Sequence, residues 1–166
     1  SGAMRLAAVE LGKIANDLRL LNSGPHTGLA EIELPALQPG SSIMPGKVNP
    51  AVAEMLNMVC FHVIGRDVAM TMCAEAGQLE INVMMPYIAY GLFDASYVFT
   101  NAVRTFDAKC VRVIKADRER CREFRDRSVG LAALHNDELG FLGAAKLAEK
   151  AIETGRTIDQ LIEKER

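Results

Sequence analysis

The chain lacks tryptophan and is poor in the other aromatic residues, with three Tyr and six Phe in 166 residues. Core volume must therefore come from aliphatic side chains and eight Met, which suits packed helices better than aromatic-rich sheets. Glycine and proline are not enriched, at 13 and 6 residues. This composition excludes a collagen-like chain and a disordered linker.

Neither sign of charge dominates, because 19 basic residues face 21 acidic ones and the formal net charge is −2. A broadly basic nucleic-acid binder and an acidic solvating tail are therefore excluded. The most charged segment, residues 115–127, interleaves both signs. It predicts a short solvated helix with Asp117 as its N-cap.

The four cysteines have no CxxC spacing, and no pair of histidines completes a zinc pattern (Cys60, Cys73, Cys110 and Cys121). We interpret them as reduced, mostly buried thiols of a cytoplasmic protein. Residues 1–4 have no basic or apolar region of the kind a signal peptide needs, and they resemble a remnant of a cleaved expression tag. We expect the natural segment to begin near Arg5, inside a longer protein.

Hydrophobic periodicity predicts an all-α fold, without a strand-rich region. Residues 5–114 form a central helical-bundle segment in this interpretation, and residues 115–166 form a small C-terminal helical domain. Residues 81–103 carry one charge, Asp94, but polar residues interrupt them, so burial in a bundle is favoured over a membrane span. The expected helices are 5–22, 50–76 with Asn49 as N-cap, 79–113 with a kink at Pro86, 139–152, and 158–163 capped by Thr157.

Helices this long and apolar need partner helices, either from sequence outside the chain or from other subunits. The least regular segment, residues 23–49, precedes the expected helix 50–76. A loop of this length within a compact domain is usually functional or disordered.

The loop GSSIMPGKVNP, residues 40–50, is the richest candidate site. Two hydroxyls, one lysine and one asparagine precede a helix N-terminus, where backbone N–H groups and the helix dipole favour an anion. Lys47 adds a point charge suited to a carboxylate or phosphate. Composition alone also allows a flexible surface loop with ordinary turn residues.

The same residues match the G-S-x-x-M-x-x-K-x-N signature of the fumarase/aspartase superfamily, which the chain resembles from about Leu6 onward. KIANDLRLLNSGP before the loop and CAEAGQLEINVMMP after it are similar to that family at matching separations. Residues 34–38 and 78–84 resemble the aspartate ammonia-lyase branch of the superfamily. The resemblance implies an all-α fold with long central bundle helices.

The resemblance also implies roles for particular residues. Ser41 would be the general base that removes a proton from the carbon next to a carboxylate, with its alkoxide stabilised by amides around Gly46 and by Lys47. Lys47 and Asn49 would hold the substrate carboxylate as it becomes an aci-carboxylate. Ser42 and Met44 would line the same pocket.

Glu54 is the remaining candidate catalytic residue. In the family this position pairs with an active-site histidine from an earlier segment, whereas an ordinary helical glutamate that reaches solvent is the alternative. None of the chain's own histidines matches the family's catalytic one. His62 is expected to be a partnered core histidine, and Arg19 is expected to make structural polar pairings within the bundle.

The implied activity is elimination of ammonia from L-aspartate to give fumarate, with no metal or organic cofactor. The implied partners are a small dicarboxylate, the N-terminal portion of the same enzyme and further subunits of a homotetramer, and the isolated chain would have little activity. Two alternatives stay open. One is a fumarase or another fumarate-forming lyase, and the other is a non-catalytic helical assembly module.

Overall fold

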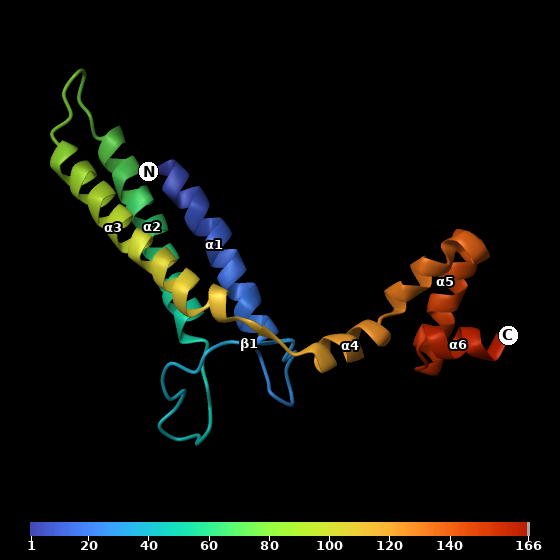
Figure 1. Cartoon of the computed structure of the whole chain (residues 1–166). Coiled ribbons are helices and arrows are strands. Elements are labelled where there is room, and N and C mark those ends of the chain that lie inside the picture. The colour runs from blue at the N-terminus through green and yellow to red at the C-terminus, as the bar shows by residue number, and fades with distance from the viewer. Residues whose placement is uncertain (166) are drawn as a thin grey trace. The chain divides into compact units, whose positions relative to one another are not determined.

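The computed structural model describes residues 1–165 and is all-α, as predicted (Figure 1). The chain divides into two compact units, Ser1–Lys115 and Ala116–Arg166. The only strands among the described residues are two-residue pieces, β1 (Ile32–Glu33) and β2 (Lys115–Ala116), which pair with each other. The helices therefore supply nearly all of the packing.

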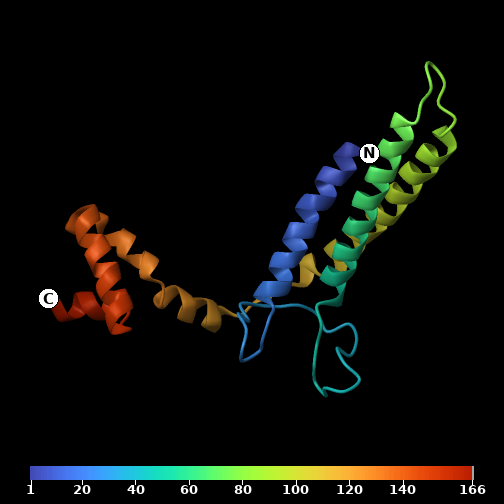
Figure 2. The ribbon, with the colours of Figure 1, turned by 180° about the vertical axis from the view of Figure 1, so that it is seen from behind.

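Three long helices lie side by side in the first unit: α1 (Gly2–Leu21), α2 (Ala51–Glu75) and α3 (Met85–Lys109) (Figures 1 and 2). Small residues dominate their shared core, which lets the helix backbones approach closely. Larger side chains, among them Leu56 and Phe106, fill the remaining space. The buried residues of this core are Ala8, Ala15, Ala53, Leu56, Cys60, Val63, Ala95, Ala102, Phe106 and Cys110.

The start of α1 differs from the sequence-based expectation. The helix includes Gly2–Met4, the residues interpreted above as a tag remnant. Met4 packs against the bundle core, and the Ser96 hydroxyl lies 3.4 Å from its sulfur. Met4 therefore contributes to the packing of this chain.

The expected cap of α2 was wrong. Pro50, and not Asn49, occupies the N-cap position, and no side chain caps the helix. The Asn49 side chain instead donates a 3.0 Å hydrogen bond to the Gly40 carbonyl, which lies across the preceding loop. Asn49, although a residue type that often caps helices, thus closes the preceding loop instead.

The expected start of the next helix was also wrong. Residues 77–84 form a tight connection with an isolated bridge between Gln78 and Ile81, and α3 begins only at Met85. Pro86 therefore lies in the first turn of the helix. No backbone hydrogen bond is lost there and no kink forms, because the first amides of a helix have no intrahelical partner.

A polar network joins the apolar faces of α2 and α3. The Asp94 carboxylate lies 2.8 Å from His62 Nε2 and accepts a 3.1 Å hydrogen bond from Arg66 Nε. Arg66 also donates to the Tyr87 hydroxyl at 3.1 Å and lies over the Tyr90 ring. His62 is therefore partnered as expected, but at a partly exposed position rather than in the core.

This network predicts an acid dependence of stability. The His62 hydrogen bond, followed by the charge of Arg66, holds the pKa of Asp94 below its ordinary value. A carboxyl with a lowered folded-state pKa stabilises the fold above its unfolded pKa, and this contribution is lost as pH falls through the folded value. We expect the melting temperature to fall less steeply below about pH 4 in Asp94→Asn than in the parent chain. Parallel melting curves across that range would contradict the prediction.

Asn57 is the most buried polar side chain of the bundle, with 3% of its surface exposed. Its amide donates to the Gly12 carbonyl at 3.0 Å and accepts from Arg19 at 3.1 Å. Both ends of the side chain are thus satisfied, as a buried amide requires. The structural role expected for Arg19 is confirmed by this contact.

The second unit contains α4 (Arg118–Asp126), a 3₁₀ segment η2 (Val129–His135), α5 (Asn136–Thr154) and α6 (Ile158–Glu165). Two expected caps are confirmed: Asp117 accepts from the Arg120 amide at 2.9 Å, and Thr157 exchanges hydrogen bonds with Gln160. Gly140, with φ at +67°, interrupts α5. The helix therefore starts earlier than predicted but contains a bend.

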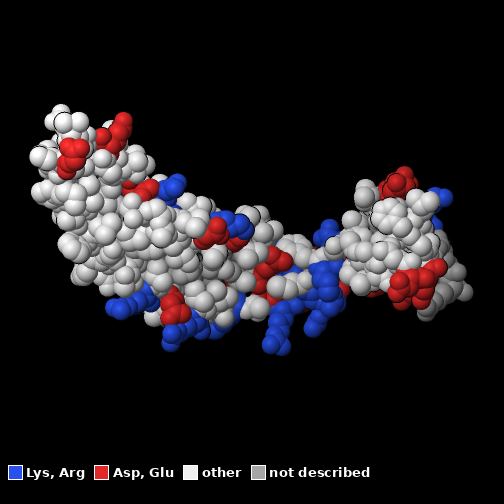
Figure 3. Space-filling view, turned by 90° about the horizontal axis from the view of Figure 1, so that it is seen from above, with Lys and Arg blue, Asp and Glu red and all other residues white. Residues whose placement is uncertain are grey.

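The surface of the first unit carries many uncharged side chains, and Figure 3 shows broad uncharged areas on one face. Among residues 1–165, no helix is both long and apolar enough to cross a membrane. Cys60, Cys73 and Cys110 have free thiols, and burial raises the pKa of the Cys60 and Cys110 thiols. The exposed large apolar residues of α2 and α3 include Met58, Phe61, Val68, Met72, Phe93 and Tyr97.

Candidate functional site: the serine loop

The serine loop, defined as residues 38–50, lies between β1 and α2 and is closed at its base by main-chain contacts (Figure 2). Pro39 and Val48 form an antiparallel bridge, and the Gly40 amide donates to the Lys47 carbonyl at 2.9 Å. The Asn49 side chain adds its hydrogen bond to the Gly40 carbonyl. The loop therefore has a fixed neck and a solvent-exposed tip.

Glycine is required at two points of the loop for different reasons. A Cβ on Gly40 would lie 2.6 Å from the Lys47 carbonyl oxygen, so any side chain there would push the neck apart. Gly46 has open space around it but a φ of +78°, a region that other residues rarely adopt. The backbone conformation of the loop thus accounts for glycine at both positions.

Ser41 accepts two backbone hydrogen bonds. The amides of Ile43 and Met44 each donate to its Oγ at 3.1 Å. Two N–H dipoles directed at one hydroxyl oxygen favour negative charge on that oxygen, as donors do in an oxyanion hole. Backbone amides thus donate to Ser41, but they are those of Ile43 and Met44 and not the expected amides around Gly46.

The loop encloses a hollow of about 550 Å³ that brings some of the predicted site residues together. Ser41, Met44 and Lys47 line it, whereas Ser42, Asn49 and Glu54 do not. Among the described residues, no carboxylate pairs with the Lys47 ammonium. An exposed, unpaired cation and a polarised hydroxyl therefore share one concave surface.

Asn49 and Glu54 lie at the junction of the loop and α2. Asn49 uses one of its two amide hydrogens at the neck, so the second hydrogen and the amide oxygen remain for a ligand. Glu54 lies in the first turn of α2 and is half-buried. Neither side chain contacts Ser41 through a hydrogen bond in the described part of the chain.

The backbone donors at Ile43 and Met44 were missed by reasoning from side-chain chemistry. An amide contributes to a site whatever side chain its residue carries, so residue identity does not reveal it. The one available signal was the serine itself, because Ser hydroxyls often accept from the backbone two or three residues on.

Known proteins resemble this chain along almost its full length. A family model described as lyase matches residues 1–65. The aspartate ammonia-lyase of Pseudomonas canavaninivorans is 48% identical over 165 residues, which cover 99% of this chain and 35% of that protein. The aspartate ammonia-lyase of Bacillus subtilis (strain 168) is 45% identical over 161 residues, which cover 97% of this chain and 34% of that protein.

Solved structures agree with the sequence matches. The fumarate lyase:delta crystallin structure from Brucella melitensis in native form has a TM-score of 0.89 and 47% identity, over 98% of this chain and 37% of that one. The class II fumarase of Schistosoma mansoni has a TM-score of 0.91 and 40% identity, over 98% of this chain and 34% of that one.

The chain is thus similar in sequence and in its helical fold to lyases of the fumarase/aspartase superfamily. More particularly, it is similar to a C-terminal portion of aspartate ammonia-lyases. The chain spans about a third of the length of the curated relatives it matches.

Proposed function

We propose that this chain is part of a carbon–nitrogen lyase of the aspartate ammonia-lyase type, which eliminates ammonia from L-aspartate to give fumarate. The observation that carries the proposal is the Ser41 hydroxyl. Its oxygen accepts hydrogen bonds from two backbone amides, and the unpaired Lys47 lines the same hollow. A serine hydroxyl is a poor base unless its ionised form is strongly stabilised. The loop provides such stabilisation locally.

In this mechanism the ionised Ser41 oxygen takes the proton from the carbon next to the side-chain carboxylate of aspartate. The electron pair of the broken C–H bond moves into that carboxylate and forms an aci-carboxylate. Lys47 and the remaining amide hydrogen of Asn49 stabilise its extra negative charge. When the pair returns, a carbon–carbon double bond forms, the C–N bond breaks and ammonia leaves with the electrons of that bond.

The other candidate residues have supporting roles in the proposal. Ser42 and Met44 contact the bound substrate when the loop closes on it, and Glu54 orients a histidine supplied by the rest of the enzyme. We infer a homotetrameric assembly in the cytoplasm, where other copies and the rest of the enzyme cover the exposed apolar faces of α2 and α3.

The test is a comparison of the complete enzyme with the 166-residue chain, with both proteins followed by the absorbance of fumarate. We expect the complete enzyme to deaminate aspartate and the isolated chain to show little or no turnover, because groups from outside the chain complete the site. Faster turnover of malate than aspartate would instead favour a fumarase, the first alternative.

A complete enzyme that converts neither substrate, nor any related fumarate-forming one, would favour the second alternative, a non-catalytic assembly module. Turnover of aspartate by the isolated chain at ordinary enzymic rates would contradict the need for the remaining sequence.

A further inference from the structure

A second pocket, of about 430 Å³, lies in the first unit between the segment that leads to the serine loop and the end of α3. Its apolar walls are Leu34, Pro35, Leu37 and Val113. The volume falls in the range of small-molecule sites, which are mostly apolar with a few polar groups that orient the ligand.

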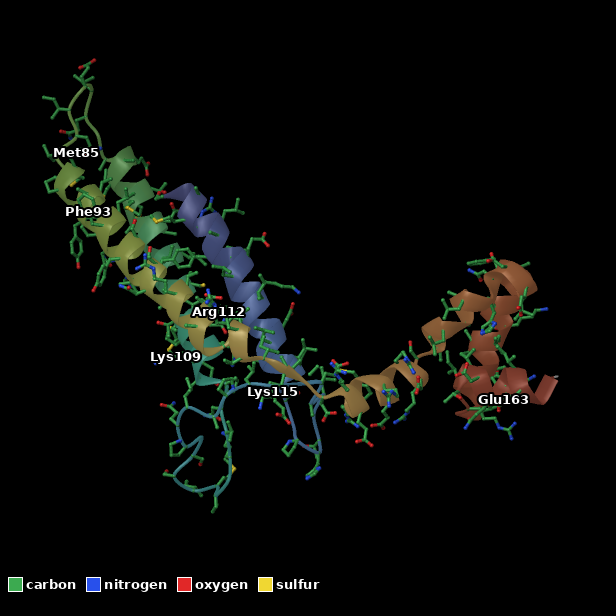
Figure 4. The ribbon with its side chains drawn as sticks, viewed as in Figure 1. Met85, Phe93, Lys109, Arg112, Lys115 and Glu163 are labelled. Atoms are coloured by element: carbon green, nitrogen blue, oxygen red, sulfur yellow. The ribbon has the colours of Figure 1, made fainter. Side chains whose placement is uncertain are left out.

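Three charged side chains complete the lining. Glu33 comes from β1. Lys109 comes from the last turn of α3 and Lys115 from β2 (Figure 4). Within the part of the chain that the structure describes, neither lysine forms an ion pair. The residues of the lining carry two ammonium groups and one carboxylate, a formal charge of +1.

The neighbouring Arg112 does not add to this charge. It lies between the two lysines in sequence but does not line the pocket, and its guanidinium pairs with Asp107 at 2.7 Å. The hydrogen bond from Arg112 to Asp107 raises the pKa of the arginine. The pocket's excess positive charge therefore belongs to Lys109 and Lys115 alone.

We propose that this pocket, here called the lysine pocket, binds a small monocarboxylate with a branched or aromatic apolar body. The carboxylate would lie between Lys109 and Lys115, and the apolar body would cover Leu34, Leu37 and Val113. One negative charge balances the net charge of the lining, and an apolar body removes the exposed wall residues from water.

The lysine pocket is separate from the proposed active site. Neither Ser41 nor Lys47 lines it, although Leu37 lines both hollows. The two sites also differ in the ligand that suits them. The serine loop is proposed to take a dicarboxylate without an apolar body, so loss of lyase activity would leave this proposal intact.

The test uses the 166-residue chain and the probe 4-methylpentanoate, with 4-methylpentanamide as its uncharged counterpart. We expect the acid to shift the NMR signals of the Leu37 and Val113 methyl groups in a saturable way, and the amide to bind more weakly. Titration to about 10 mM covers dissociation constants near 1 mM. This comparison needs no variant and therefore does not depend on whether a variant folds.

Variants of the charged side chains then show which of them contribute to binding of the acid. Lys109→Gln and Lys115→Gln should each weaken binding of the acid about two- to fivefold, as expected for an exposed ion pair. Glu33→Gln should strengthen binding by a similar factor because it removes the opposing carboxylate. Arg112→Gln is the matched control, and we expect it to leave the affinity unchanged.

Three results would overturn the proposal. The first is an absence of saturable shifts at Leu37 and Val113. The second is an amide that binds as tightly as the acid, which would show that the lysines have no part in recognition. The third is an Arg112→Gln effect as large as that of the lysine variants, which would indicate a diffuse field rather than a built pocket.

Discussion

Replacement of Ser41 by alanine in the complete enzyme is expected to lower kcat for aspartate by about 10²- to 10⁴-fold, the usual contribution of a positioned general base. The variant loses the one oxygen that the Ile43 and Met44 amides polarise. The groups proposed to hold the substrate stay in place, so KM should change much less than kcat. Initial rates of fumarate formation over a range of aspartate concentrations measure both quantities.

Thr105→Ala is a suitable control for this experiment. It also removes one hydroxyl, from a half-buried position on α3 where the side chain donates a hydrogen bond to the Asn101 carbonyl. We expect its kcat to match that of the parent enzyme. If Ser41→Ala retained nearly full activity while Thr105→Ala did too, Ser41 would not be the base and the mechanism proposed above would be wrong.

Leu56→Ala is expected to lower the free energy of unfolding by about 2–5 kcal/mol, the range for large-to-small changes in a packed core. Leu56 lies on α2, is fully buried and belongs to the bundle core, in which alanine is the commonest buried residue. Truncation there would leave a cavity, because the packed surroundings of a core residue relax only partly. Urea unfolding of the 166-residue chain, followed by far-UV circular dichroism, measures the change.

Leu79→Ala provides the same chemical change at a site that is 98% exposed. We expect it to alter stability by no more than about 0.5 kcal/mol, as is usual for a surface substitution. Both variants must be compared at one protein concentration, since self-association would stabilise the folded state by mass action. Equal losses at the two positions would show that the bundle core does not hold this unit together.

The helices themselves could be predicted from the sequence where local signals and packing agreed. Thr157 caps α6 as expected, because a cap depends on contacts within a few residues; the structure adds Gln160, which completes a capping box. Pro86 was misread for the opposite reason. An apolar run continues on both sides of it, and only the tertiary structure shows that residues 77–84 turn back before the helix starts.

In the candidate site, too, local features could be predicted from the sequence and features that depend on the folded loop could not. The hydroxyl, the lysine and the glycines of the serine loop were visible as residue types, whereas the hydrogen-bond partners of Ser41 and Asn49 depend on how the loop folds back on itself. Asn49 has the side chain of a good helix cap, but its amide closes the neck at Gly40 because the loop brings that carbonyl within reach. The lysine pocket could not be predicted at all, since Glu33 and Lys109 are far apart in sequence.

The two amides on Ser41 come from residues only two and three positions further along the chain. Because these hydrogen bonds lie within one short segment, the two amides and the Ser41 side chain would move together. If the loop swings during turnover, the serine carries its own electrostatic environment along, and no neighbouring subunit has to arrive first. Assembly would then determine where the base meets its substrate, while the ability of Ser41 to act as a base would be a local property of the serine loop.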